Sequence, residues 1–344
     1  MTSRHTADIN VQETLKLTND ERKAISASPA PPFKTTKHWL SLLDGSLDDP
    51  LRRQVVPTTA EQRTLPGELQ DPLGEDAFSP LPRLVHRYKN RVLVVVTGEC
   101  ALYCRHCFRR RLTGDSFGEI TETQIQDISR WLSLHSEVKE LLLSGGDPLT
   151  LKDNKLFKIM DSFRTARPDI VFRLATRIPI VAPERITTSL VRELGCRRPL
   201  WVVIQANHPR EISPEAISAL EKIQLQGLPV INQTVLLRGV NDNIEILEEL
   251  SNALVRIAVK PYYLFQGDLA EGTGHFRLPL EEGLRLTEEL RARVSGLGMP
   301  SYAVDLPGGG GKVPLGANYI QSRSNEGWKL KTPDGNEGLY KEKL

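Results

Sequence analysis

Residues 92–107 read VLVVVTGECALYCRHC, an apolar run that leads directly into a loop with three cysteines. The run at 92–97 is rich in β-branched residues, which is typical of a buried strand. The three cysteines are Cys100, Cys104 and Cys107. Three thiolates can hold three irons of a four-iron cluster and leave the fourth iron open to a small molecule, whereas most cluster-binding proteins supply four ligands. The loop therefore predicts an iron–sulfur cluster at the end of a strand.

Outward from this stretch, short apolar runs alternate with segments of helical periodicity. Five further runs are expected strands: 140–144, 170–174, 201–205, 230–236 and 260–265. The expected helices are 121–134, 155–164, 182–194, 214–226 and 243–257. Strands that alternate with helices predict a parallel sheet covered by helices. We expect an α/β fold, a partial (β/α)6 barrel, with a closed eight-unit barrel and a doubly wound sheet as the alternatives.

The chain is expected to divide into three parts. Prolines keep interrupting residues 1–84, which predicts an irregular or partly helical N-terminal arm. Its first helix is expected at Asn19–Ser26, with Asn19 as the cap. Residues 85–300 form the predicted barrel. Residues 301–344 form a C-terminal segment with a glycine-rich loop, followed by a polar tail that is either a surface hairpin or a loose end.

The composition argues against several classes of protein. The 45 basic and 43 acidic side chains give a formal net charge of +2, without the basic excess of a dedicated nucleic-acid binder. No apolar run resembles a signal peptide or is long enough to span a bilayer. Three of the four cysteines lie within eight residues, which does not fit a disulfide framework. We expect a cytoplasmic protein that binds neither nucleic acid nor a membrane.

Two glycine-rich segments are candidates for ligand binding. Residues 144–148 read SGGDP at the end of the second expected strand, where glycines let the backbone approach a ligand and Asp147 can accept from an ammonium. Residues 305–312 read DLPGGGGK. This is not a Walker loop, because Val313 rather than Ser or Thr follows Lys312. A lysine on such a loop can form a Schiff base with pyridoxal phosphate (PLP).

The cysteine spacing and residues 144–148 together resemble the radical S-adenosylmethionine (SAM) superfamily. Residues 302–314 resemble the lysine-bearing segment of the lysine 2,3-aminomutase family within that superfamily. Further similar segments extend from about residue 45 to residue 320: 49–54, 71–73, 79–80, 86–88, 104–111, 233–242 and 261–277. The family also includes short relatives that make β-lysine for attachment to elongation factor P.

This resemblance implies three cofactors, namely a [4Fe–4S] cluster, SAM and PLP. It implies that the three cysteines hold the cluster. It also implies that Lys312 is the catalytic lysine that carries PLP, with Arg87 and Arg91 at the phosphate. The residues that it places beside SAM are Ser144, Gly145, Gly146, Asp147, Gln205 and Gln233.

The resemblance also implies a substrate and a reaction. Arg109 matches the residue that pairs with the substrate carboxylate, and Asp268 and Asp305 match two carboxylates that hold the ε-ammonium of lysine. The expected enzyme is an isomerase that converts L-lysine to β-lysine (3,6-diaminohexanoate) by radical 2,3-amino migration. The alternatives are the same chemistry supplying β-lysine for elongation factor P, and a 2,3-aminomutase for another amino acid. Expected partners are L-lysine and an electron donor such as flavodoxin or ferredoxin. The sequence leaves open whether the chain forms a homo-oligomer.

Three positions depart from the family pattern: Gln205 replaces a histidine, Phe265 a tyrosine and Gly267 a cysteine. Gln205 keeps its hydrogen-bonding capacity, so we expect SAM binding to persist. The alternative in which the protein is not an enzyme is a zinc-binding scaffold, where His106 or Cys196 would supply the fourth zinc ligand.

Overall fold

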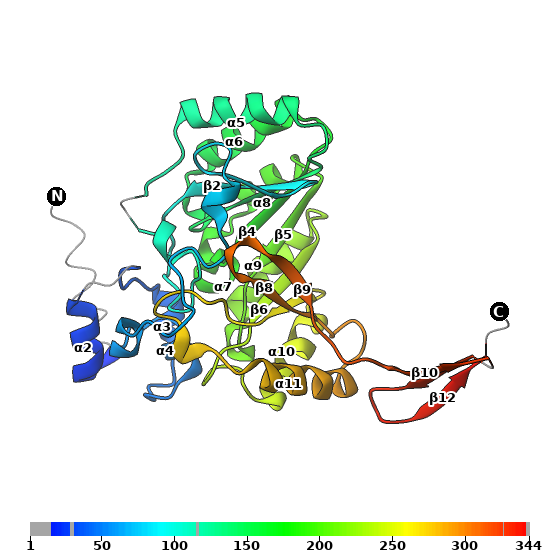
Figure 1. The fold of residues 1–344 in the computed structure, drawn as a ribbon. Coiled ribbons are helices and arrows are strands. Elements are labelled where there is room, and N and C mark those ends of the chain that lie inside the picture. Colours follow the sequence, from blue (N-terminus) through cyan, green and yellow to red (C-terminus); the bar gives the residue numbers. More distant parts are fainter. Residues whose placement is uncertain (1–14, 28–30, 115–116, 326, 342–344) are drawn as a thin grey trace.

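The computed structural model describes residues 15–27, 31–114, 117–325 and 327–341 (Figure 1). In the described residues, the largest element is a nine-stranded sheet whose strands follow one another in chain order. Its parallel strands are β2 (Arg91–Thr97), β3 (Glu140–Gly145), β4 (Val171–Thr176), β5 (Leu200–Ile204), β6 (Val230–Val235), β7 (Lys260–Phe265) and β8 (Ser301–Leu306). At the two edges, β1 (Leu84–Tyr88) and β9 (Gly311–Pro314) pair antiparallel with β2 and β8. The sheet curls into a half-barrel, which confirms the expected α/β partial barrel.

Helices cover the outer face of this sheet (Figure 1). They are α5 (Glu122–Leu134), α6 (Asp153–Ala166), α8 (Thr188–Gly195), α9 (Pro214–Gln224), α10 (Ile244–Arg256) and α11 (Leu280–Arg293). Several begin where a side chain satisfies a free backbone amide of the first turn. Thr121, Ser213 and Asn243 accept such hydrogen bonds at the start of α5, α9 and α10. These caps explain why the expected starts of the three helices lie close to the observed ones.

Several segments differ from the expected elements, and strands β1 and β9 at the sheet edges were not expected. The segment 182–194, expected to be one helix, contains a 3-10 turn (Pro183–Arg185) followed by α8, which begins where the Thr187 side chain accepts from the backbone N–H of Leu190. The short helix α7 (Ile178–Val181) precedes this segment, and it cannot continue through Pro183, which lacks an N–H donor. Strand β8 was not among the expected strands. Only its middle residues are buried, and Leu306 at its end is 41% exposed, so its apolar signal is weak.

The C-terminal tail forms a small sheet of its own. Strands β10 (Ile320–Ser324), β11 (Gly327–Lys331) and β12 (Glu337–Tyr340) pair antiparallel in that order. The tail therefore contains one strand more than the expected hairpin. This sheet extends away from the half-barrel (Figure 1).

The N-terminal arm packs on the barrel. Its helices are α2 (Asn19–Ser26), α3 (Lys37–Ser41) and α4 (Pro50–Arg53). The bounds of α2 match the prediction, but Thr18 rather than Asn19 is the cap, because Thr18 and Glu21 exchange hydrogen bonds in a capping box. Trp39 and Leu51 are fully buried in the same apolar core as the barrel strands. In the described ranges, no helix is long and apolar enough to cross a membrane.

Candidate active site

The concave side of the half-barrel encloses a cavity of about 370 Å³. Every residue that the sequence predicted to bind a cofactor or a substrate lines it: Arg87, Arg91, Cys100, Cys104, Cys107, Arg109, Ser144, Gly145, Gly146, Asp147, Gln205, Gln233, Asp268, Asp305 and Lys312. Most of these residues lie at or just beyond the C-terminal ends of parallel strands, where barrel folds build their sites. The cavity is therefore the candidate active site.

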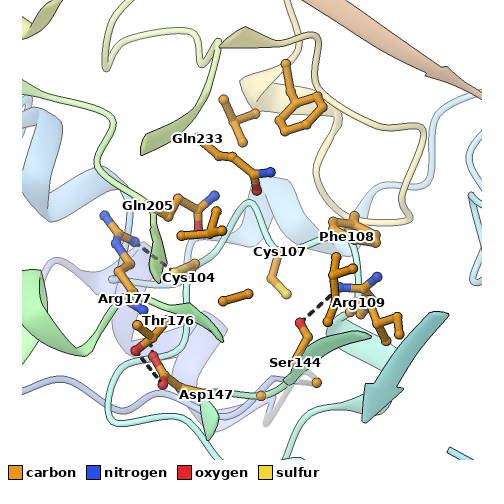
Figure 2. Close-up of a pocket in the computed structure, with 18 of the residues that line it drawn as sticks. Cys104, Cys107, Phe108, Arg109, Ser144, Asp147, Thr176, Arg177, Gln205 and Gln233 are labelled. Atoms are coloured by element: carbon orange, nitrogen blue, oxygen red, sulfur yellow. Dashed lines mark hydrogen bonds between the residues drawn. The ribbon is translucent and has the colours of Figure 1, made fainter. Parts of the chain in front are cut away.

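The cysteine loop follows β2 and enters the cavity (Figure 2). All four cysteines of the chain are free thiols, and the three in the loop are half-buried. Burial raises the pKa of Cys107 to about 11 and raises the pKa of Cys100 well above its usual range, with smaller contributions from nearby negative charges. Arg177, which follows β4, donates from Nη1 to the Sγ of Cys104 at 2.8 Å. Within the described residues, no three His, Cys, Asp or Glu side chains are grouped to hold a single metal ion.

The arginines that accompany the cysteines bind acids of the N-terminal arm. Arg105 and Arg110 pair with Glu61, Arg109 pairs with Glu75, and Arg111 pairs with Asp71 and Asp76. The Arg105–Glu61 pair is fully buried, with an Nη2–Oε2 distance of 2.6 Å. These contacts join the loop that carries the cysteines to a segment about forty residues earlier in the chain. The arm thus forms part of the support of the candidate site.

The SGGDP segment packs directly against the start of the cysteine loop. A Cβ atom on Gly145 would lie 2.4 Å from the carbonyl oxygen of Thr97, and one on Gly146 would lie 2.2 Å from that of Glu99. Both glycines are therefore required by the chain's own packing, in addition to any approach of a ligand. The carboxylate of Asp147 accepts hydrogen bonds from the Thr176 hydroxyl and from the backbone N–H groups of residues 149, 177 and 178. Asp147 thereby fixes the end of β3 to the end of β4.

Lys312 lies opposite Asp305 in the β8–β9 ladder. Its Nζ donates to Oδ2 of Asp305 at 2.5 Å and lies 3.9 Å from the ring centre of Phe265. Burial lowers the pKa of Lys312, although Asp305 acts in the opposite direction. Asp268, which follows β7, is half-buried and lines the same cavity. Burial, reinforced by the negative charge of Asp305, raises the pKa of Asp268 to about 7.

Arg87 and Arg91 belong to the β1–β2 edge of the cavity. The Nη1 atom of Arg87 lies 4.0 Å from Oδ1 of Asp305. Its Nε and Nη2 atoms are buried and have no hydrogen-bond partner among the described residues. The guanidinium of Arg91 lies 3.9 Å from the ring centre of Tyr88. Buried N–H donors without an acceptor lower the stability of the folded protein. An anionic group bound at this corner of the cavity would supply the missing acceptor.

Sequence reasoning missed two residues of this site. Glu75 forms an ion pair with Arg109, and Arg177 contacts Cys104, and both line the cavity. Arg177 lies three residues after the strand expected at 170–174, and a position just beyond the C-terminal end of a barrel strand favours function, so a signal was available. Glu75 lies in the irregular arm, where no local pattern singles out one acid from its neighbours.

The sequence matches the family model of the radical SAM superfamily over residues 94–250 and that of lysine-2,3-aminomutase over residues 287–343. It is 41% identical over 310 residues to the L-lysine 2,3-aminomutase of Clostridium subterminale, covering 90% of this chain and 74% of that protein. This chain belongs to the lysine 2,3-aminomutase family. A glutamate 2,3-aminomutase of Clostridioides difficile is 37% identical over 299 residues, covering 87% of this chain and 71% of that protein.

Among solved structures, a radical SAM methyltransferase from Sphaerobacter thermophilus aligns with 64% of this member of the lysine 2,3-aminomutase family. The alignment covers 68% of that chain, with a TM-score of 0.46 and 18% sequence identity.

Lysine 2,3-aminomutases are isomerases of the radical SAM superfamily, and they use a [4Fe–4S] cluster, SAM and PLP. The side chains of the cavity fit each of these groups. Three free thiols line one wall, and Lys312 and the unpartnered donors of Arg87 fit an aldehyde that bears a phosphate. In the view of Figure 2, Cys104 and Cys107 lie between Gln205 and Gln233 on one side and Ser144 and Asp147 on the other. Polar groups on both sides of the cysteines suit the polar parts of SAM.

Proposed function

We propose that this protein is a PLP-dependent radical SAM aminomutase that converts L-lysine to β-lysine. The observation that carries the proposal is the contact of Asp305 with the primary ammonium of Lys312, in a cavity that Asp268 also lines. The chain's own lysine side chain thus already contacts one of two acids that line the cavity. The same pair is suited to the ε-ammonium of a lysine substrate, because a buried ammonium needs compensating carboxylates.

The other end of an amino acid substrate has a matching partner in the same cavity. Arg109 is the proposed partner of the α-carboxylate, since guanidinium groups bind carboxylates at two points. A glutamate substrate would bring its second carboxylate toward Asp268 and Asp305, where like charges repel. The charges of the site therefore favour lysine over glutamate, although a glutamate 2,3-aminomutase is among the relatives.

The proposed roles of the chain's residues rest on the resemblance to the family and on their position in one cavity. Cys100, Cys104 and Cys107 would hold the cluster, while Ser144, Gly145, Gly146, Asp147, Gln205 and Gln233 would surround SAM and Arg87 and Arg91 would hold the phosphate of PLP. When bound, the cluster and SAM supply the radical that takes a hydrogen atom from the substrate, and PLP supplies the carbonyl that holds the migrating nitrogen.

Lys312 is the proposed attachment point of PLP. Its partly buried amine needs to lose a proton before its nitrogen can act as a nucleophile, and burial lowers its pKa in that direction. The neighbouring oxygen of Asp305 is placed to take this proton from Nζ, because it already accepts a hydrogen bond from it. The ring centres of Tyr263 and Phe265 lie 5.1 Å and 3.9 Å from Nζ of Lys312, so the two rings cover part of its side chain.

The test is product formation by the reconstituted protein. The protein is purified without oxygen, supplied with iron, sulfide and PLP, and mixed with SAM, dithionite and L-lysine, and β-lysine is sought by mass spectrometry. We expect β-lysine only when SAM and PLP are both present. The Lys312→Ala variant should keep its iron but form no product. Substrate-dependent cleavage of SAM with L-glutamate, and none with L-lysine, would contradict the proposal.

A further inference from the structure

Glu75 forms a two-point ion pair with Arg109 at the edge of the cavity. Its Oε1 atom accepts from Nη2 of Arg109 at 2.6 Å and from Nε at 3.0 Å, and its Oε2 atom lies 3.1 Å from Nε. Glu75 is 6% exposed and begins the 3-10 turn Glu75–Phe78. The pair is therefore a buried part of the site rather than a surface contact.

The contacts of Arg109 leave one side of its guanidinium available. Arginine has five N–H donors in a planar fork, and the two edges of that fork can each bind a carboxylate. Glu75 uses the edge formed by Nε and Nη2, while Nη1 approaches the hydroxyl of Ser144 at 3.4 Å (Figure 2). The edge formed by Nη1 and Nη2 is not used by Glu75. A second carboxylate can bind there without displacing Glu75.

We propose that Glu75 is a positioning residue for the carboxylate of the amino acid substrate. It holds the guanidinium of Arg109 so that the Nη1–Nη2 edge is presented to the substrate carboxylate. This inference rests on the proposed function, because it assigns the free edge to the α-carboxylate of the amino acid. Glu75 also compensates the positive charge of the Arg109 guanidinium before the substrate arrives. Without Glu75, this charge would be left without a partner inside the site, which is destabilising.

The segment that carries Glu75 is itself fixed to the loop before Lys312. The backbone N–H of Gly308 donates to the carbonyl oxygen of Pro72 at 3.1 Å. Gly74 has a φ of +61°, and a Cβ atom on it would lie 2.8 Å from the carbonyl carbon of Gly308. A single segment therefore supports the Arg109 end of the cavity and the loop that leads to Lys312. Such support fixes the separation between the two ends of a bound amino acid.

The test compares two ligands that differ only in the carboxylate. L-lysine and L-lysinamide are titrated into the PLP-loaded protein without SAM, so that no turnover occurs, and binding is followed by the visible absorbance of PLP. In the Glu75→Gln variant we expect the Kd for L-lysine to rise about tenfold, since two charge-assisted hydrogen bonds no longer orient Arg109. The Kd for L-lysinamide should change less than about twofold. In turnover assays KM should rise with little change in kcat, because Arg109 holds the substrate carboxylate equally in the ground state and in the transition state.

Asp76→Asn is the matched control. Asp76 lies next to Glu75 and pairs with Arg111, and neither Asp76 nor Arg111 lines the cavity. This variant should bind both ligands as the wild type does. Three results would overturn the inference: unchanged binding of L-lysine by Glu75→Gln, tighter binding of L-lysine, or an equal loss of affinity for both ligands. Tighter binding would mean that Glu75 competes with the substrate for Arg109.

A second variant covers the case in which Glu75→Gln does not retain iron and PLP. Glu75→Asp keeps the negative charge on a side chain that is one methylene shorter, so it should weaken L-lysine binding selectively and by a smaller factor. Wild-type affinity for L-lysine in this variant would then overturn the inference. The proposed function fails separately, if the wild-type protein forms no β-lysine. The preference for an amino acid over its amide can still be measured in that event.

Discussion

At the scale of single residues, the part of the cavity near Asp305 is arranged around one ammonium group. Lys312 supplies that charge to Asp305 in the ligand-free protein, and Asp268 lies close enough to be affected by the same carboxylate. If Lys312 holds PLP as proposed, its charge no longer compensates Asp305. In the proposed function an incoming ammonium would then compensate this carboxylate, which would link the attachment of PLP to the selection of a cationic substrate.

The pKa of Asp268 predicts a pH dependence. Because burial and Asp305 raise this pKa to about 7, the carboxyl is neutral below that pH and charged above it. We expect kcat/KM for L-lysine to fall by up to about tenfold per pH unit below pH 7, as measured by initial rates across a pH series. Asp305→Asn removes the neighbouring negative charge, so the pKa of Asp268 should fall and the decline should move to lower pH. A decline that stays at the same pH in this variant would rule out the assignment to Asp268.

Arg87 offers a prediction about PLP. Its Nε and Nη2 atoms have no partner in the described part of the chain, and they are the proposed donors to the phosphate. Arg87→Ala should weaken PLP binding by roughly ten- to a hundredfold, because a hydrogen bond to a charged group contributes about 1.5–3 kcal/mol. The measurement is a PLP titration followed by absorbance. Arg130→Ala, which removes an exposed side chain on α5, should bind PLP as the wild type does, and equal affinity in both variants would argue against a role for Arg87.

At the scale of elements, the helices with a clear apolar period and a capping residue were predictable. The starts of α5, α9 and α10 follow from local signals of this kind. The cap of α2 was predicted wrongly at Asn19, although Thr18 with Glu21 three residues later is the stronger local pattern. Strand β8 escaped prediction for a different reason. Its pairing with β7 is a long-range contact, and its partly exposed residues give little local signal.

The contact between the SGGDP segment and the cysteine loop predicts a stability effect. In Gly146→Ala the new Cβ atom would meet backbone atoms of Glu99, which cannot move as freely as the end of a side chain. We expect a loss of about 1–3 kcal/mol in the free energy of unfolding, measured by urea denaturation of the cofactor-free protein. In Gly316→Ala the Cβ atom meets no atom within 4 Å, so its stability should stay close to that of the wild type. Equal stability of the two variants would show that the Gly146 contact relaxes at little cost.

At the scale of the whole molecule, the arm and the barrel act together around the cysteine loop. The convergence of the predicted site residues in one cavity follows from the half-barrel, because parallel strands bring their C-terminal ends to one side. The pairing of Arg105 with Glu61 and of Arg109 with Glu75 could not be predicted in this way. Each pair joins residues more than thirty positions apart, and an arginine-rich loop alone does not identify which acids it meets.

The final prediction concerns the acid that two arginines share. Glu61 is buried and binds both Arg105 and Arg110, so Glu61→Gln leaves two buried guanidinium groups without their carboxylate. We expect the free energy of unfolding to fall by about 3–5 kcal/mol in urea denaturation at neutral pH, together with a lower iron content after reconstitution. Burial acts to raise the pKa of Glu61, but the two arginines outweigh it and lower the pKa overall.

The direction of that pKa shift gives the same prediction a pH test. A carboxyl whose pKa is lowered by folding stabilises the protein above its unfolded pKa, and this contribution disappears as the pH falls through the folded value. The difference in stability between wild type and Glu61→Gln should therefore shrink below about pH 4. Asp48→Asn removes the exposed partner of Arg53 and should cost at most about 1 kcal/mol at any pH. If both variants unfold at the same urea concentration, Glu61 does not fix the arm to the cysteine loop, and the site depends on the barrel alone.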